Sequence, residues 1–517
     1  MTKKHETIII TALSVAAIVL ALLLGSRLWF RLDLTASKLY TISPASRGLA
    51  GSLQSQIKIT YFLSDKLRQL YPQPGEIVDL VREYVTYSDG GIRFTVRDPG
   101  KEGLEGDLER LGIYPRQMQT VERNEASVSN VFSGILIEYM EKTDIIPFVF
   151  SLETLEYDLT SRIRALVSGR TREAGIILAD TAKSLDGNYR NLTGTLRMSG
   201  YRVREIPVGD EIPEGLSEVI LIGGVDTLDE TALSLIDGYI QRGGKVLFLV
   251  ENLMLSTATG RMEVVPRTDG GLLAMLRSYG VDVQGALVLD KSCLTITYQS
   301  AGAGGMPVIR LVRYPFWISV TREGGYSNHP VTSAFAGLDL FWANPLTLSA
   351  VEGVEAVPLL SSTAEAWLMT QDFAVEPGQS FLFTREEDKT SGEKLLAAAL
   401  SGRFPPYFKD GDGKAAGGAD SRIIVVGNNE FVNDQYLNSD RNLTFLLLAA
   451  DWLANDDDII SIRSRASGTP RLDRITEPKK KAAAMAFARS LNTVVIPAAV
   501  LAFAIAFGLK RRRRASR

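Results

Sequence analysis

Two long apolar runs lie near the ends of the chain, and the residues between them follow the shorter hydrophobic periods of a globular protein. Residues 7–26 and 490–509 contain no charged side chain and are apolar all round. About 20 residues of helix, rising about 1.5 Å each, cover the hydrocarbon core of a bilayer, which is about 30 Å thick. The pattern therefore predicts transmembrane helices at 7–27 and 490–509.

Basic residues flank both runs on the side of the chain ends. The tail 1–6 contains Lys3 and Lys4, and the tail 510–517 opens with five consecutive basic residues. Positive charge concentrates on the cytoplasmic side of membrane proteins. We expect both tails in the cytoplasm and the main domain on the outer face of the cytoplasmic membrane. A cleaved signal peptide is the alternative for the first run, but no small-residue cleavage site follows it.

Alternating and helical periods fill residues 55–150, after a juxtamembrane stalk at 28–54. Strands are predicted at 57–63, 92–96, 131–139 and 143–150, and helices at 74–87 and 104–111. The order β-α-β-α-β-β resembles the thioredoxin fold. The Cys-x-x-Cys pair of that fold would follow the first strand, where residues 64–67 read Ser-Asp-Lys-Leu. We therefore predict a thioredoxin-like domain without redox chemistry.

Residues 151–455 show the alternation of strands and helices that is typical of a parallel α/β sheet. Buried strands are predicted at 175–179, 201–206, 218–222 and 245–250, and helices at 189–199 and 229–242. Residues 263–420 are less regular. An apolar run at 422–427, followed by a helical pattern at 442–454, predicts one more strand of the same sheet. A polar linker at 456–489 leads to the second apolar run.

Composition and charge narrow the class of partner. The chain of 517 residues is 45% hydrophobic and 23% charged, which is typical of two or three folded domains. Setting the two tails aside lowers the basic count from 57 to 49 and the acidic count from 60 to 59. This negative balance argues against a nucleic-acid partner. The single cysteine, Cys293, excludes an intrachain disulfide and a cysteine-rich metal site.

Familiar catalytic patterns are missing from the sequence. Gly243, Gly244 and Lys245 lack the further glycine and the Ser or Thr of a phosphate-binding loop, and this lysine follows a predicted helix instead of preceding one. The loop 410–413 begins like a calcium loop but lacks the oxygen ligands that should follow. Cys293 lacks the glycine-flanked turn that exposes a nucleophile. We therefore predict a protein that is not an enzyme and that uses neither a cofactor nor a metal.

Four polar residues remain as candidates for lining a ligand pocket. Asp98, Asp180 and Glu251 each end a predicted strand, which is where sites in α/β sheets are commonly built. His329 is one of only two histidines, and its neighbours Asn328 and Pro330 are typical of a turn. We expect a loop role for His329 and keep it with the three carboxylates as a ligand-pocket candidate.

Several short phrases, taken in order, resemble one protein family. They are RLDLT at 31–35, LYTIS at 39–43, VRDP at 96–99, a helix end at 239–244 before the strand 245–250, NHPVT at 328–332, and DWL at 451–453. This set resembles the GldG-like auxiliary proteins of bacterial ABC transport systems over nearly the whole chain. The resemblance implies a permease subunit and a separate ATPase subunit as partners, in agreement with the missing phosphate-binding loop.

The resemblance also implies that the larger α/β domain belongs to the glutamine-amidotransferase-like, Rossmann-like class and that the membrane is a bacterial inner membrane. The predicted fold class is therefore an α/β protein in which two transmembrane helices flank the thioredoxin-like domain and this larger domain. Enzymes of the glutamine-amidotransferase-like class use a cysteine at a strand-to-helix elbow, and this chain has none. The leading hypothesis is a non-enzymatic, membrane-anchored auxiliary subunit whose outer domain binds cargo or an envelope partner.

Two alternatives stay open. A membrane-tethered hydrolase or carbohydrate-binding protein would bring two candidate carboxylates together in a pocket. An architectural envelope spacer would have no sizeable pocket.

Overall fold

The computed structural model describes most of the chain between residue 41 and residue 454. The gaps are 123–124, 151, 153, 170–171, 257–260, 302–306, 327–328, 334, 409–417 and 438–439, and beyond 454 the described residues are Ile462, Arg489, Ser490 and Thr493. The fold and the sites below belong to the compact unit that ends at Ser467.

The predicted fold class is corrected in its membrane-spanning helices. None of the helices in the described residues combines the length and the apolar character needed to cross a bilayer. The longest of them, α4 (Gln73–Tyr87), has 15 residues, fewer than the roughly 20 that a span requires. The fold class is therefore corrected to a mixed α/β fold, and the predicted inner-membrane location with cytoplasmic termini is withdrawn with it.

Several predicted segments lie outside the described residues. They are the tails 1–6 and 510–517, the first run 7–27, the stalk up to residue 40, the loop 410–413, and, apart from four single residues, the linker 456–489 and the second run 490–509.

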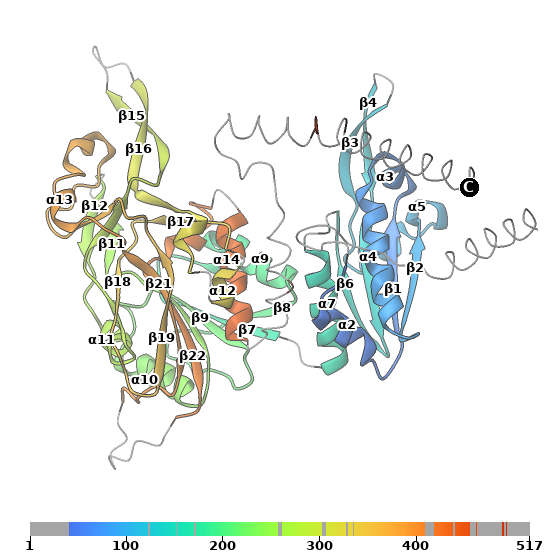
Figure 1. Ribbon diagram of the computed structural model, residues 1–517, viewed down its shortest axis with the longest axis horizontal. Helices are drawn as coiled ribbons and strands as arrows, with labels where there is room; N and C mark the ends of the chain where they lie inside the picture. The colour runs from blue at the N-terminus through green and yellow to red at the C-terminus, as the bar shows by residue number, and fades with distance from the viewer. Residues whose placement is uncertain are drawn as a thin grey trace, which may run out of the picture. The chain divides into compact units, whose positions relative to one another are not determined.

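The first part of the fold is a four-stranded mixed sheet with helices against it (Figure 1). Its strands are, in spatial order, β2 (Ile92–Arg97), β1 (Ile57–Leu63), β5 (Ser133–Tyr139) and β6 (Lys142–Ile146). Strand β1 pairs parallel with β2 and antiparallel with β5. Helices α2 (Pro44–Gly51), α4 and α7 (Leu155–Ser168) share its core, where Ile59, Leu80 and Leu159 are buried.

The predicted hairpin of β5 and β6 is confirmed, whereas a second hairpin was not predicted. Strands β3 (Arg116–Glu122) and β4 (Glu125–Val131) pair antiparallel. Their sequences are mainly polar, so no alternation of apolar residues predicts them. Short helices α3 (Asp65–Leu70), α5 (Pro99–Glu102) and α6 (Glu105–Arg110) complete this part. The thioredoxin-like assignment of residues 55–150 stays a prediction.

The second part is a nine-stranded sheet with a parallel core. Its strands are, in spatial order, β13 (Val281–Val283), β18 (Leu346–Leu348), β21 (Leu395–Gly402), β22 (Ser421–Val426), β10 (Val246–Leu249), β9 (Glu218–Ile222), β7 (Arg172–Leu178) and β8 (Tyr201–Glu205), with β19 (Val354–Ser361) also paired to β21. The five strands from β22 to β8 are parallel. The predicted return of residues 422–427 to the sheet is confirmed.

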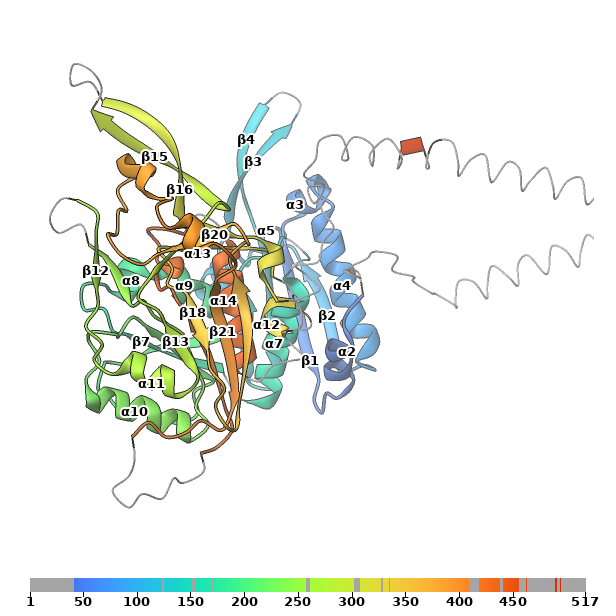
Figure 2. The ribbon, with the colours of Figure 1, turned by 60° about the vertical axis from the view of Figure 1, so that its left-hand side comes forward.

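Both faces of the parallel strands are buried, which explains why they read as continuous apolar runs. Ile220 and Ile222 face a core shared with α9 (Arg190–Met198) and α14 (Asp440–Leu453), whereas Val219 and Leu221 face a core shared with α10 (Glu230–Gln241) and α11 (Leu272–Ser278). The two pairs of helices therefore lie on opposite faces of the sheet (Figure 2).

Residues 263–420 are more regular than predicted. They contribute the antiparallel pair β14 (Leu287–Asp290) and β20 (Ala366–Met369), the ribbon β15 (Cys293–Ala301), β16 (Pro307–Val320) and β17 (Leu338–Phe341), and β12 (Glu263–Pro266), which pairs with β11 (Leu253–Ser256). Short helices α12 (Pro330–Ser333) and α13 (Glu387–Thr390) also lie in this range, and a further short helix, α8 (Leu185–Asn188), precedes α9.

Asp451, in the last turn of α14, joins four elements through one buried carboxylate. Its side chain is fully buried. Oδ1 accepts hydrogen bonds from Tyr157 on α7 at 3.1 Å, from Tyr201 on β8 at 3.0 Å, and from Arg172 Nη1 on β7 at 3.0 Å. Arg172 also donates to the carbonyl of Ser199. Because α7 follows the first sheet in sequence, this carboxylate connects both parts of the fold.

Asp451→Ala should lower the free energy of unfolding by about 3–5 kcal/mol, because Arg172 would lose the carboxylate that balances its buried charge and two tyrosine hydroxyls would lose an acceptor. Tyr157→Phe removes a single donor and should cost about 1 kcal/mol. Urea unfolding followed by circular dichroism measures both losses. Similar small losses for the two variants would contradict this account of Asp451.

Candidate functional site

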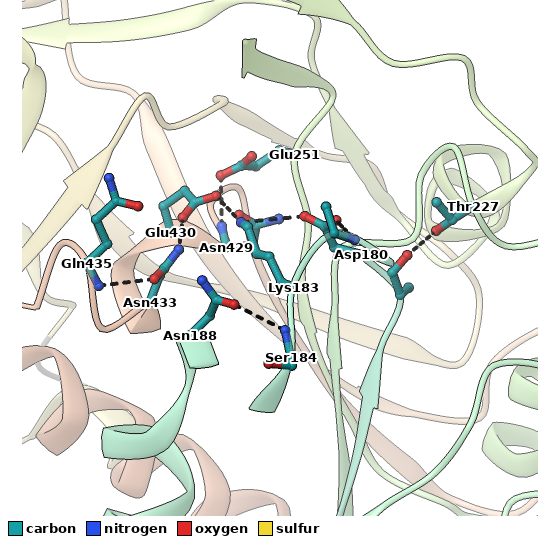
Figure 3. Close-up of polar contacts among 12 residues, drawn as sticks. Asp180, Lys183, Ser184, Asn188, Thr227, Glu251, Asn429, Glu430, Asn433 and Gln435 are labelled. Carbon is teal, nitrogen blue, oxygen red and sulfur yellow. Dashed lines mark hydrogen bonds and ion pairs between the residues drawn. The ribbon is translucent and has the colours of Figure 1, made fainter. Parts of the chain in front are cut away.

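A cluster of polar side chains lies at the carboxyl ends of the parallel strands (Figure 3). Asp180 follows β7, Gly223 follows β9, Glu251 follows β10, and Asn429 and Glu430 follow β22. The parallel strands are ordered β8-β7-β9-β10-β22, so the direction of the chain order reverses between β7 and β9. In open α/β sheets, ligands bind outside the carboxyl ends of the strands at this reversal.

Lys183 connects the loop after β7 with the loop after β22. Its ammonium group forms an ion pair with Glu430 and lies 3.6 Å from Asp180 Oδ2. Glu430 Oε2 also accepts a hydrogen bond of 2.6 Å from the side chain of Asn433. These side chains are about four-fifths buried, so the ion pairs are screened less by water than surface pairs are. One lysine thus holds two loops in a fixed relation.

Glu251 is a buried carboxyl group with an altered pKa. The residue is 5% exposed, and Oε1 accepts hydrogen bonds of 3.0 Å from Asn428 Nδ2 and from the backbone N–H of Asn429. Burial raises the pKa of Glu251 to about 8, and the nearby charge of Glu430 adds to this rise. The hydrogen bond from Asn429 and the charge of Lys183 oppose it but do not cancel it. Glu251 therefore carries a proton at neutral pH.

Within the cluster, two other buried polar side chains have atoms without a hydrogen-bond partner among the described residues. They are Asn429, through both amide atoms, and Tyr189, through its hydroxyl. Asn429 is 1% exposed and Tyr189 is fully buried. Burial, together with the charges of Glu430 and Asp180, raises the pKa of Tyr189, so the hydroxyl keeps its proton. Orphaned buried polar groups are rare in folded proteins, and a bound ligand or an ordered water would supply their partners.

Two glycines shape the loop after β9. Gly223 and Gly224 have φ angles of 81° and 99°, in the left-handed region that favours glycine. A Cβ on Gly224 would lie 2.7 Å from a methyl carbon of Leu228, which is too close. A Cβ on Gly223 would lie 3.9 Å from Asn429 Nδ2, so this backbone passes directly beside the unpartnered amide. The glycines therefore let the loop approach the side chain of Asn429 closely.

The structure brings two of the four predicted pocket residues together. Asp180 and Glu251 both belong to the cluster, where Lys183 and Glu430 lie between them (Figure 3). Asp98 instead caps α5 and accepts hydrogen bonds of 2.9 Å from the backbone N–H groups of Gly100 and Asp65.

His329 also lies apart from the cluster, in the turn before α12. Its Nδ1 accepts a hydrogen bond of 3.3 Å from the N–H of Val331, and its ring packs on Trp452 with a centroid distance of 4.8 Å. These local contacts agree with the predicted loop role.

The sequence prediction missed four residues of the cluster. Asn429 and Glu430 follow the predicted strand 422–427, so the rule that selected Asp180 and Glu251 would also have selected them. Lys183 and Tyr189 carry no comparable signal, because each lies several residues beyond a strand end. Within the described residues no group of three or more His, Cys, Asp or Glu side chains could hold a metal ion.

Comparison with known proteins gives a family and distant relatives. A family model described as "ABC-type uncharacterized transport system" matches residues 167–460, and a model for a domain of unknown function matches residues 36–138. An uncharacterized protein of Borreliella burgdorferi is 24% identical over 507 residues, which cover 94% of each chain.

Two solved structures give weaker matches. The mmIFT52 N-terminal domain matches with a TM-score of 0.33 and 16% identity, covering 54% of this chain and 96% of that one. The exo-β-1,4-mannosidase Op5Man5 of Opitutaceae bacterium strain TAV5 matches with a TM-score of 0.22 and 11% identity, covering 74% and 50%. Scores this low carry no argument about fold or function.

Glu251→Gln should reduce the dependence of stability on pH. The pKa of Glu251 is about 8 in the folded chain and 4.5 without the fold, so folding takes up a proton between these values and stability falls as the pH rises through them. Gln keeps the acceptor oxygen but has no proton to lose. Across this window the variant should lose less stability than the parent chain, by on the order of 5 kcal/mol.

Thermal unfolding at about pH 5, 7 and 9 measures this difference. Glu352→Gln, at an exposed glutamate, is the matched control and should follow the parent chain. A Glu251→Gln profile that also coincides with the parent profile would show that Glu251 does not titrate in this range.

Proposed function

This chain belongs to the family of auxiliary components of ABC-type transport systems, and on this premise we propose that its α/β domain binds cargo or a partner protein at the carboxyl edge of the sheet. Membership in the family supports an auxiliary role in a transport system and association with an ABC transporter. The cluster around Asn429 supports the other part of the proposal, the binding of cargo or a partner at the sheet edge.

The observation that carries the proposal is the unpartnered amide of Asn429. A buried polar side chain without a partner costs about 1–3 kcal/mol, and this cost is offset when a ligand completes its hydrogen bonds. The amide can donate and accept at once, and the protonated Glu251 and the Tyr189 hydroxyl lie in the same cluster. A ligand with its own donors and acceptors suits this set.

The charge of the cluster narrows the ligand class. Asp180 and Glu430 contribute two carboxylates against the single ammonium group of Lys183, and both already contact that lysine. An added anion would meet uncompensated negative charge, whereas a neutral or cationic group would not. We therefore expect neutral or cationic polar ligands at this edge, and cargo or a partner side chain of that chemistry.

The proposal assigns no chemical step to the chain. Energy for transport would come from a separate ATPase subunit acting with a permease, since residues 243–245 lack the features of a phosphate-binding loop. The chain would contribute recognition only.

A hydrolase is the second candidate, because Asp180 and Glu251 lie in one cluster. Acid–base hydrolysis needs one protonated and one ionised carboxyl group, and the raised pKa of Glu251 would supply the protonated one. The contact between Lys183 and Asp180 opposes this role, since it occupies the carboxylate that would activate water. Turnover of glycoside or ester substrates that is lost in Asp180→Asn would favour the hydrolase.

Purification of the tagged full-length chain in mild detergent should recover an ATPase and a permease. Mass spectrometry of the purified material, compared with a tag-only purification, identifies the partners. Repeated recovery of the chain alone would contradict association with a transporter.

Asn429→Leu tests the proposed site. Replacing an orphaned amide by an apolar side chain of similar size should leave stability within about 1 kcal/mol of the parent or raise it. If Asn429 binds a ligand, the recovered amount of at least one small molecule or protein that purifies with the parent chain should be at least fivefold lower for this variant. Asn191→Leu, at an exposed position on α9, is the control. Unchanged recovery of every component would show that Asn429 is not part of a binding site.

A further inference from the structure

A cavity of about 610 Å³ lies away from the cluster described above. It is lined by residues of β6 and α7 and by residues around the end of α9 and the start of β8, including Lys142, Asp144, Arg162, Arg197 and Arg202. Cavities of about 300–1,000 Å³ are typical of small-molecule sites. A spacer protein was expected to have no sizeable pocket, so this volume argues against a purely architectural role.

The cavity is strongly basic although the chain is acidic. Four of its lining residues are cationic and one, Asp144, is anionic, whereas the whole chain has a formal net charge of −3. Clustered charge of one sign in a recess raises the local concentration of ions of the opposite sign. The cavity is therefore suited to an anion.

Arg162 provides a rigid centre for this charge. Its side chain is 7% exposed, Nη1 donates to Asp144 at 2.8 Å, and Nη2 donates to the carbonyl of Met198 at 2.6 Å. Nε is buried and has no partner among the described residues. The guanidinium is thus held in one orientation while these two bonds use only two of its five N–H groups, which is the arrangement of a preorganised anion-binding arginine.

Glycines keep the wall of the cavity open. Gly169 and Gly200 line it with φ angles of 67° and 85°, in the left-handed region. A Cβ on Gly169 would lie 3.1 Å from Lys142 Nζ, so a larger residue there would crowd the ammonium group. The exposed side chains of Arg197 and Arg202 complete the lining and remain free to move toward a ligand.

We propose that this cavity binds a small phosphate-bearing anion. Three guanidinium groups match the several oxygens and the double charge of a phosphate better than they match a single carboxylate. The volume admits a molecule larger than one phosphate ion. The cavity contacts the first residues of β8, and the cluster around Asn429 lies at the opposite, carboxyl ends of the strands. The two sites therefore differ in place and in the charge of the ligand that they favour.

Calorimetric titration of inorganic pyrophosphate into the purified full-length chain tests this proposal. We expect saturable binding that weakens at least tenfold in Arg202→Glu. Arg204→Glu is the matched control: Arg204 is exposed two residues further along β8, on the same face, and does not line the cavity. This control should change the affinity less than twofold. Absence of saturable binding by the parent chain, or equal losses in the two variants, would overturn the proposal.

A second arm separates free phosphates from lipid headgroups. Vesicles of phosphatidylcholine with and without phosphatidylglycerol are mixed with the chain and sedimented. Retention that requires phosphatidylglycerol, is displaced by pyrophosphate and is lost in Arg202→Glu would assign the same cavity to a lipid phosphate. Pyrophosphate binding without such retention would assign it to a soluble ligand. Retention that pyrophosphate does not displace, or that persists in Arg202→Glu, would count against the cavity as the site.

Discussion

The buried carboxylate of Asp451 is the constraint on which the arrangement of this fold most depends. It accepts hydrogen bonds from a helix that follows the first sheet, from two neighbouring strands of the second sheet, and is itself carried by α14. A buried charge is tolerated only when its partners are all in place. Helix α14 packs on the sheet in which β7 begins at this carboxylate and leads to Asp180 of the polar cluster. The interaction that connects the two parts of the fold therefore also holds the sheet that carries Glu251 and Asn429.

The sequence predicted best the elements whose burial is complete and local. Strands β9, β10 and β22 are apolar throughout because helices cover both faces, and each was predicted within a few residues. Strands β3 and β4 are mainly polar, so this pair leaves no readable period, whereas β14 and β20 were missed although both are apolar. The transmembrane prediction rested on two end segments, and the described helices contain no such span.

Only part of the candidate site, Asp180 and Glu251, could be predicted from the sequence, for a physical reason. Carboxylates at strand ends form a site only where the strands are central and parallel, as they are for Asp180 and Glu251. Asp98 obeys the same local rule, but β2 lies at the edge of its sheet and ends in exposed positions, so the side chain caps a helix instead. Tyr189 and Lys183 could not be predicted, because their places depend on how α9 and its preceding loop fold back over the sheet.

The α/β domain thus presents two polar regions of opposite character: an acidic edge with unpartnered amide and hydroxyl groups, and a basic cavity at the other ends of the strands. The central claim is that an auxiliary component of an ABC transport system uses the acidic edge for recognition. Hydrogen–deuterium exchange of the chain, alone and within its purified transporter complex, tests this claim most directly. The account predicts slower exchange in the complex for the loops at 179–189, 223–228 and 428–436. Unchanged exchange in all three loops, with protection confined to other surfaces, would contradict it.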